Sequence, residues 1–271
     1  MKPIHRLMRA LMIFALCVWQ LATPASAAAS AGPPKPTVIL VHGAFAESAS
    51  WNAVVRYLRA RDYPVIAAAN PLRGLASDAA FVGALVSSVE GPVVLVGHSY
   101  GGSVISVAAH GQANVRALVF VAAFAPDTGE SAVELSSRFP GSTLGQALAP
   151  PVVLPDGARD LYIAQDKFWS QFAADVPSDA GRLMAASQRP VTEGALAEGA
   201  TQAAWKTIPS WFVYGDADKN IPPAALAFMA QRAKAVKTVV ARGASHSVLV
   251  SRPHSVGRII VEAASSKAGE P

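Results

Sequence analysis

Cysteine is almost absent from this sequence, and charged residues are few. The 271 residues include one cysteine, Cys17, and 15% of them are charged against 52% that are hydrophobic. This balance favours a single compact domain with a large core. Cys17 lies in an N-terminal segment that we expect to be removed. Without it the chain has no means of forming a disulfide, a thiol nucleophile or a thiolate metal site.

The N-terminal apolar run is too short to cross a bilayer. It covers residues 10–22, about 13 residues where a membrane helix needs about 20. Three basic residues precede it, and the A-x-A-like stretch Pro24-Ala25-Ser26-Ala27 follows. This layout is typical of a secretory signal peptide. We therefore expect cleavage near Ala27, export to the periplasm or the medium, and no stable membrane anchoring.

Loss of this segment removes most of the net positive charge. Residues 1–27 contain Lys2, Arg6 and Arg9 and no acidic residue, so 20 of the 23 basic residues remain against 18 acidic ones. The formal charge of the chain falls from +5 to +2. No basic cluster remains after residue 27, so nucleic acid is not an expected partner.

Short apolar strands alternate with amphipathic helices along most of the chain. We expect strands at residues 37–41, 65–68, 92–96, 117–122, 211–214 and 238–240. Ser50 and Ser77 are candidate N-caps of the first two helices, and the second helix would bury Phe81, Leu85 and Val89. The alternation indicates an α/β fold with a doubly wound, mostly parallel sheet of about six strands.

Residues 127–206 break this alternation. They are rich in Pro, Gly, Ser and Ala and show no strand pattern, and short helices are expected at 161–174, 180–186 and 192–205. An insertion of this length between two core strands favours a helical cap over the sheet edge. The expected organisation is a signal peptide (1–27), a flexible leader (28–36), an α/β core (37–126 and 207–271) and a helical cap (127–206).

A serine lies where a buried strand meets a helix. The motif Gly97-His98-Ser99-Tyr100-Gly101 joins the strand at 92–96 to a helix that begins near Tyr100. Flanking glycines let the two backbones approach closely, and the serine hydroxyl is pushed out of the turn. The G-x-S-x-G pattern alone is common by chance. In this context it predicts that Ser99 is a nucleophile.

A serine nucleophile needs a base, and in a parallel sheet the base must follow a strand. His246 follows the last strand and precedes a helix, so it is the predicted base. His42 and His98 are expected to have structural roles. The remaining histidines are in the signal segment or at ordinary polar positions: His5, His110 and His254.

The base in turn needs a carboxylate that orients it. Asp218 lies in the loop after the penultimate strand, where it can reach His246, and is the preferred acid. Asp216, nearer the strand end, is better placed to accept hydrogen bonds from backbone donors. Asp127 also follows a core strand and is the outside candidate.

The order Ser, Asp, His and the motifs around these residues resemble the α/β-hydrolase superfamily. The resemblance runs from Thr37 to the C-terminal helix and rests on Gly97–Gly102, His42–Phe45, Gly215–Asp218 and Gly243–His246. This sequence differs from the common pattern of the superfamily in one respect. The sheet begins directly at Thr37, which leaves no room for the antiparallel strands that often open this fold.

Within that superfamily, Val41–Phe45 together with Ser50-Trp51 is similar to the small esterases that include plant methylesterases and hydroxynitrile lyases. A bacterial esterase of this branch is the implied identity. The resemblance further implies an oxyanion hole formed by the backbone N–H groups of Ala44 and Tyr100.

The expected function is a serine hydrolase that cleaves carboxylic esters of small hydrophobic or aromatic acids through an acyl-enzyme. It needs no metal or cofactor, and its partner is a small-molecule ester. Four aromatic residues are candidates for the substrate pocket: Phe45, Phe168, Trp169 and Phe172.

Other activities are compatible with the same triad. A cofactor-free perhydrolase or haloperoxidase is one alternative. Another is C–C cleavage as in a hydroxynitrile lyase, although Ser247 stands where the plant lyases have a lysine after the catalytic histidine. A non-catalytic ligand receptor is a third possibility, and the complete triad argues against it.

Overall fold

The computed structural model describes residues 34–266. The predicted signal peptide and its cleavage site at Ala27 lie outside the described residues, as does most of the predicted leader. None of the helices within residues 34–266 combines the length and apolar character that a membrane span requires.

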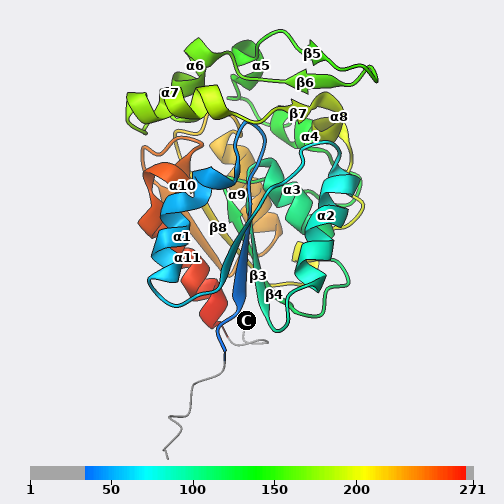
Figure 1. Cartoon of the computed structure of the whole chain (residues 1–271), viewed down its shortest axis with the longest axis vertical. Coiled ribbons are helices and arrows are strands. Elements are labelled where there is room, and N and C mark those ends of the chain that lie inside the picture. Colours follow the sequence, from blue (N-terminus) through cyan, green and yellow to red (C-terminus); the bar gives the residue numbers. More distant parts are fainter. Residues whose placement is uncertain (1–33, 267–271) are drawn as a thin grey trace, which may run out of the picture. The chain divides into compact units, whose positions relative to one another are not determined.

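Six parallel strands form the central sheet (Figure 1). They are β1 (Thr37–Val41), β2 (Val65–Ala68), β3 (Val93–His98), β4 (Val115–Val121), β8 (Ser210–Gly215) and β9 (Lys237–Ala241). Their order in the sheet is β2-β1-β3-β4-β8-β9. Every residue of β3 is buried, in keeping with a valine-rich strand covered on both faces. The predicted six-stranded, doubly wound α/β sheet is confirmed.

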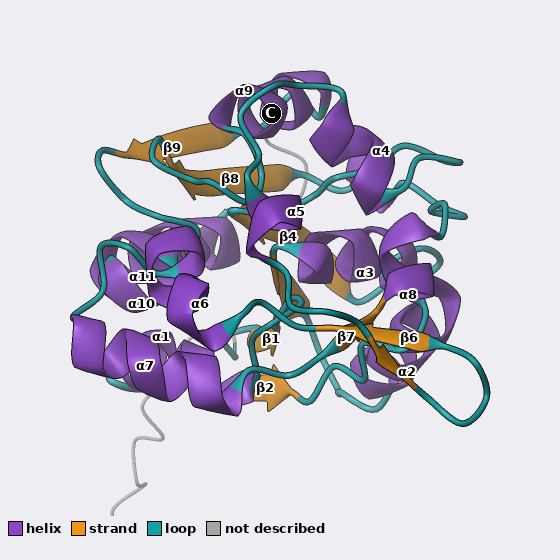
Figure 2. Ribbon diagram, turned by 90° about the horizontal axis from the view of Figure 1, so that it is seen from above, coloured by secondary structure: helices purple, strands orange, loops and turns teal. Residues whose placement is uncertain are grey.

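Helices cover both faces of this sheet (Figure 2). One face carries α1 (Asn52–Arg59), α10 (Val248–Ser251) and α11 (Pro253–Ser265), with a short 3-10 helix, η1 (Ser48–Trp51), before α1. The other face carries α2 (Leu75–Ser87), α3 (Tyr100–Ala108) and α9 (Pro223–Arg232). The sheet is thereby enclosed, and its carboxyl edge is left for the loops.

The two predicted N-caps are wrong. Ser50 lies inside η1, and Ser77 lies inside α2, whose N-cap is Gly74. The first two amides of α2 instead donate to the Glu198 carboxylate, at 2.6 Å for Leu75 and 3.2 Å for Ala76. A carboxylate 122 residues away satisfies donors that a local serine was expected to satisfy.

The segment between β4 and β8 lies above the carboxyl edge of the sheet (Figure 1). Its helices are α4 (Ala132–Ser137), α5 (Leu144–Ala147), α6 (Gln165–Phe172), α7 (Ser178–Ser187), α8 (Glu193–Ala197) and the 3-10 helix η2 (Ala204–Lys206). The helix expected at 192–205 therefore ends early. The expectation of a cap without strands is also wrong, because β5 (Val152–Val153), β6 (Arg159–Leu161) and β7 (Val191–Thr192) form a small antiparallel sheet.

The chain leaves β1 and β3 in opposite directions. From β1 it continues to β2 on one side of the sheet, and from β3 to β4 on the other. Val41 pairs with Gly97, so the loops after both strands begin side by side. Open α/β sheets form their ligand crevice at such a switch point. The predicted nucleophile and the predicted oxyanion loop both lie at this point.

Candidate active site

Ser99 lies on a strained turn between β3 and α3. Its φ of 54° and ψ of −124° are unusual for a residue with a side chain, and strain of this kind costs about 1–3 kcal/mol. The approach of strand and helix requires glycine at position 97. A Cβ there would lie 2.5 Å from the Gly101 carbonyl oxygen. The G-x-S-x-G pattern thus reflects a backbone requirement of the strand-to-helix turn.

His246 and Asp218 form a buried hydrogen-bonded pair. The Nδ1 of His246 lies 2.7 Å from Oδ2 of Asp218, and both side chains are almost completely buried. The other carboxylate oxygen accepts from the amides of Asn220 at 2.8 Å and Ile221 at 3.0 Å. Nε2 of His246 is buried and has no hydrogen-bond partner among residues 34–266. This nitrogen is therefore left free to accept a proton.

The structure distinguishes the three aspartates proposed as the acid. Asp216 is exposed and accepts a hydrogen bond from the Gly243 amide at 2.6 Å. Asp127 forms an ion pair with Lys206. Asp218 is the carboxylate that meets His246, and Asp216 instead joins its own loop to the loop that carries the base.

Two further histidines are buried, and the ring of one of them, His98, lies 4.8 Å from the His246 ring. Burial lowers the pKa of His42 to about 4, and its Nδ1 lies 3.0 Å from the Gly43 carbonyl. Burial, together with the nearby His246, lowers the pKa of His98 well below its ordinary value. Nε2 of His98 lies 3.2 Å from the His246 carbonyl oxygen. Both rings are therefore neutral, and His98 supports the backbone of the predicted base.

The backbone amides of Ala44 and Tyr100 lie beside the turn at Ser99. A Cβ on Gly43 would lie 2.6 Å from the Cβ of Ser99 and 3.1 Å from the Tyr100 nitrogen, so the Gly43-Ala44 loop passes directly beside the serine. Neither the Ala44 amide nor the Tyr100 amide donates a hydrogen bond to another described residue. Tyr100 also begins α3, where the helix dipole favours negative charge.

The side chain of Tyr100 is held by a hydrogen bond to a buried carboxylate. Its hydroxyl donates to Oδ2 of the buried Asp78 at 2.9 Å. Burial raises the pKa of Asp78 despite this hydrogen bond and one from the Arg73 amide. Tyr100 is thus held in place by its side-chain hydrogen bond and by its position at the start of α3.

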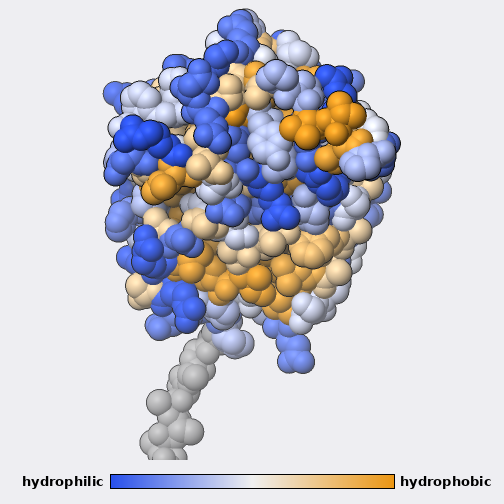
Figure 3. All heavy atoms as spheres, turned by 45° about the horizontal axis from the view of Figure 1, so that its top comes forward, coloured by the Kyte–Doolittle hydropathy of each residue, from blue (hydrophilic) through white to orange (hydrophobic). Residues whose placement is uncertain are grey.

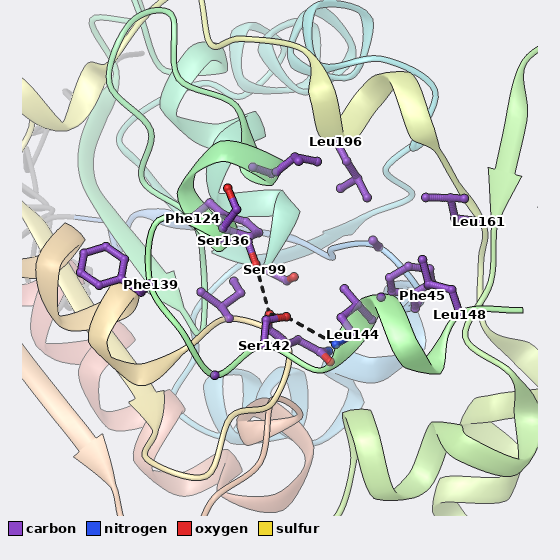
Figure 4. Close-up of a pocket in the computed structure, with 18 of the residues that line it drawn as sticks. Phe45, Ser99, Phe124, Ser136, Phe139, Ser142, Leu144, Leu148, Leu161 and Leu196 are labelled. Atoms are coloured by element: carbon purple, nitrogen blue, oxygen red, sulfur yellow. Dashed lines mark hydrogen bonds between the residues drawn. The ribbon is translucent and has the colours of Figure 1, made fainter.

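Ser99 and Ala44 open onto a cavity of about 550 Å³ beneath the cap (Figure 4). Its lining is mainly apolar, and hydroxyl groups and one amide side chain supply most of its polar atoms. Glu193 is the only charged side chain that lines it among the described residues, and its carboxylate lies 3.2 Å from the Arg159 guanidinium. The principal apolar lining residues are Phe45, Phe124, Phe139, Leu144, Leu148, Leu161 and Leu196.

Of the four aromatic residues expected in the pocket, Phe45 lines the cavity and the other three do not. Phe168 and Phe172 are fully buried and pack on each other, and the Phe172 ring lies 4.9 Å from the His246 ring. Trp169 is 40% exposed and donates to the Val176 carbonyl. The aromatic side chains of α6 serve packing because this helix lies over the His246 loop.

The lining residues that sequence reasoning missed come mainly from α4, α5 and the loops beside them. These segments are four to six residues long, too short for an apolar periodicity to show which side faces inward. Residues 34–266 contain no group of three or more His, Cys, Asp or Glu side chains placed to hold a metal ion.

Comparisons with known proteins show the family of the chain. The family model described as "Alpha/beta hydrolase family" matches residues 38–258. The chain is 28% identical over 252 residues to the alpha/beta hydrolase nvfD of Aspergillus novofumigatus, covering 85% of this chain and 97% of that protein.

Solved structures show the same fold. Polyneuridine aldehyde esterase matches with a TM-score of 0.73 at 17% identity, covering 84% of this chain and 98% of that one. The methylesterase MES16 from Arabidopsis matches with a TM-score of 0.68 at 17% identity, covering 85% and 99%. The resemblance to methylesterase-like proteins, first indicated by short motifs, extends to the architecture of the chain.

Proposed function

The chain belongs to the alpha/beta hydrolase family, and on this basis we propose that it hydrolyses carboxylic esters through an acyl-enzyme on Ser99. One observation carries the proposal. The serine on the strained turn opens onto an apolar cavity, while in a buried His246–Asp218 pair one imidazole nitrogen has no hydrogen-bond partner within the described part of the chain. A serine hydroxyl is a weak nucleophile until an oriented base takes its proton.

In the proposed reaction, Ser99 Oγ attacks the ester carbonyl carbon while His246 Nε2 takes the hydroxyl proton. Asp218 holds the ring in the required tautomer and stabilises the imidazolium that forms. The amides of Ala44 and Tyr100 donate to the oxyanion, and one such donor is worth about 10²–10³ in rate. His246 then returns the proton to the departing alcohol. Water repeats the sequence on the acyl-enzyme and releases the acid.

The cavity supports neutral, hydrophobic or aromatic acyl groups as substrates. Its apolar side chains favour apolar groups, since burial contributes about 25 cal/mol per Å². Glu193 is neutralised in part by Arg159, so the cavity offers no free cation to a charged acid. Two of the structural neighbours are themselves called esterases, which supports the same reaction class.

The proposal is tested by removing the nucleophile. We expect Ser99→Ala to reduce hydrolysis of p-nitrophenyl acetate and butyrate by at least about 10⁴-fold with thermal stability unchanged. Ser103→Ala is a matched control, because it removes from α3 a buried hydroxyl that has no hydrogen-bond partner among residues 34–266, and it should keep full activity. Undiminished hydrolysis by Ser99→Ala would refute the assignment.

An ester panel tests the substrate class. Acyl chains from acetate to palmitate, with aryl methyl esters included, should show the highest kcat/KM for short hydrophobic or aromatic acids. Fastest turnover of palmitate would contradict this part of the proposal and leave the chemistry of Ser99 untouched.

A further inference from the structure

The end of cap helix α6 is fastened to the loop that carries His246. Oδ1 of Asp175 accepts from the Ser245 hydroxyl at 2.5 Å and from the Ser245 amide at 3.0 Å. The Phe172 carbonyl accepts from the Ser247 amide at 3.1 Å and from its hydroxyl at 2.8 Å. The residues on both sides of His246 are therefore bonded to the cap.

The same helix also reaches the loop that carries Asp218. The buried Gln171 donates from Nε2 to the Lys219 carbonyl at 2.9 Å and to Oδ1 of Asn220 at 2.7 Å. The Asn220 amide in turn donates to Asp218. Three residues within a five-residue stretch of the cap, Gln171, Phe172 and Asp175, thus contact the loops of the predicted base and the predicted acid.

Asp175 is a half-buried carboxylate with several donors around it. Burial acts to raise its pKa, but the hydroxyls of Ser245 and Ser251, the Ser245 amide and the charge of Arg252 together hold the pKa below its ordinary value. The Arg252 guanidinium lies 3.2 Å away. Hydrogen bonds to an ionised acceptor are about twice as strong as neutral ones, so this carboxylate is a firm anchor for Ser245.

We propose that Asp175 is a positioning residue for His246. It fixes Ser245 and thereby holds the neighbouring imidazole against Asp218 and toward Ser99. The segment that covers the cavity would then also align the catalytic pair. This inference rests on the proposed function of Ser99, His246 and Asp218. It goes beyond that function by placing part of the alignment in the cap.

Kinetics with a matched control test the proposal. Displacing a catalytic group by about 1 Å can cost up to about 100-fold in rate, so we expect Asp175→Ala to lower kcat by about 10- to 100-fold with KM nearly unchanged. Asp166→Ala removes an exposed carboxylate from the first turn of α6, the helix that precedes Asp175, and should match the wild type. Asp175→Asn keeps an acceptor oxygen for Ser245 and should restore most of the lost kcat. An Asp175→Ala variant with the kcat of the control would overturn the proposal.

A second measurement does not depend on any substrate. The proton on His246 Nδ1 that is shared with Asp218 should give a far-downfield proton NMR signal, identified by its absence in His246→Gln. We expect this signal to broaden or disappear in Asp175→Ala and to persist in Asp166→Ala. If Asp175→Ala does not fold, the comparison is made with Ser245→Ala. An unchanged signal in the folded variant would overturn the proposal even if kcat fell.

The two measurements separate the two proposals. If the wild type hydrolyses no ester of the panel, the proposed function fails, while the NMR signal still decides whether Asp175 positions His246. If hydrolysis is normal and neither kcat nor the NMR signal responds to Asp175→Ala, the proposed function stands and the positioning role is refuted.

Discussion

Two histidines other than the proposed base, His246, are buried with neutral rings. His42 and His98 have no exposed surface, and burial lowers the pKa of each. A protonated ring at either position would repel the imidazolium that forms on His246 during acylation. Their neutrality therefore favours the proposed reaction, and it also makes the fold sensitive to acid.

His42 makes a testable contribution to the pH dependence of stability. Its pKa is about 4 in the folded protein and about 6.5 in the unfolded chain, so the unfolded state binds more protons between these values. The contribution of the neutral His42 ring to the free energy of unfolding is fully present above pH 6.5 and decreases as the pH falls towards 4. At pH 5 the loss is about 2 kcal/mol for His42 alone.

Urea unfolding of His42→Asn at pH 7.5 and pH 5 measures this contribution. Between pH 7.5 and pH 5, the free energy of unfolding of the variant should decrease by about 2 kcal/mol less than that of the wild type. The pKa of Asp78 is raised, so this residue changes the free energy of unfolding in the opposite direction. It does so in both the wild type and the variant, and its effect therefore cancels when the two are compared. The exposed His110→Asn should behave like the wild type. Equal losses in wild type and His42→Asn would contradict the assignment.

The sequence identified residues whose roles depend on local backbone geometry. Ser99, Asp218 and His246 each follow a core strand, and parallel strands bring their carboxyl ends to one edge. The side chains of Phe168 and Phe172 could not be placed in this way. Whether they face the cavity or the His246 loop depends on how α6 lies over the sheet, which apolar spacing does not encode.

At the scale of elements, close backbone approach separates essential glycines from replaceable ones. Gly97→Ala would put a Cβ against rigid backbone of α3, and we expect destabilisation of more than about 3 kcal/mol or loss of folding. Gly83 is half-buried in α2, where a Cβ would meet the Ala108 carbonyl oxygen and the Gln112 side chain at an ordinary van der Waals distance of 3.7 Å. Gly83→Ala should stabilise by about 0.5–1 kcal/mol. Denaturant unfolding measures both, and a destabilised Gly83→Ala would contradict this view of α2.

Helix α2 also shows where apolar spacing misleads. Phe81 was expected on the buried face, but it is 45% exposed, whereas Val82 and Val86 are fully buried. The helix is apolar on several sides, so spacing alone did not identify the face that contacts α3.

The strands of the cap, β5, β6 and β7, could not be predicted from the sequence for a different reason. They are only two or three residues long, too short for any period to appear. The turn Pro155-Asp156-Gly157 between β5 and β6, with Gly157 at a φ of 84°, was the available signal for a hairpin.

At the scale of the whole molecule, we propose that the protein is exported after removal of residues 1–27. The motifs of the site begin at residue 42, beyond this segment, and the described fold begins at residue 34. Expression in a bacterium with a secretion pathway, followed by N-terminal sequencing of the exported protein, should give Ala28 as the first residue. Recovery of the uncleaved chain from the cytosol alone would contradict the proposal.

Covalent labelling of the nucleophile tests the central claim most directly. A fluorophosphonate should form one adduct per chain, and peptide mass mapping should place it on Ser99. The adduct should be absent in Ser99→Ala and present at wild-type level in Ser103→Ala. An unlabelled wild type, or an adduct on another residue while Ser99→Ala still hydrolyses esters, would contradict the claim that Ser99 is the nucleophile of this hydrolase.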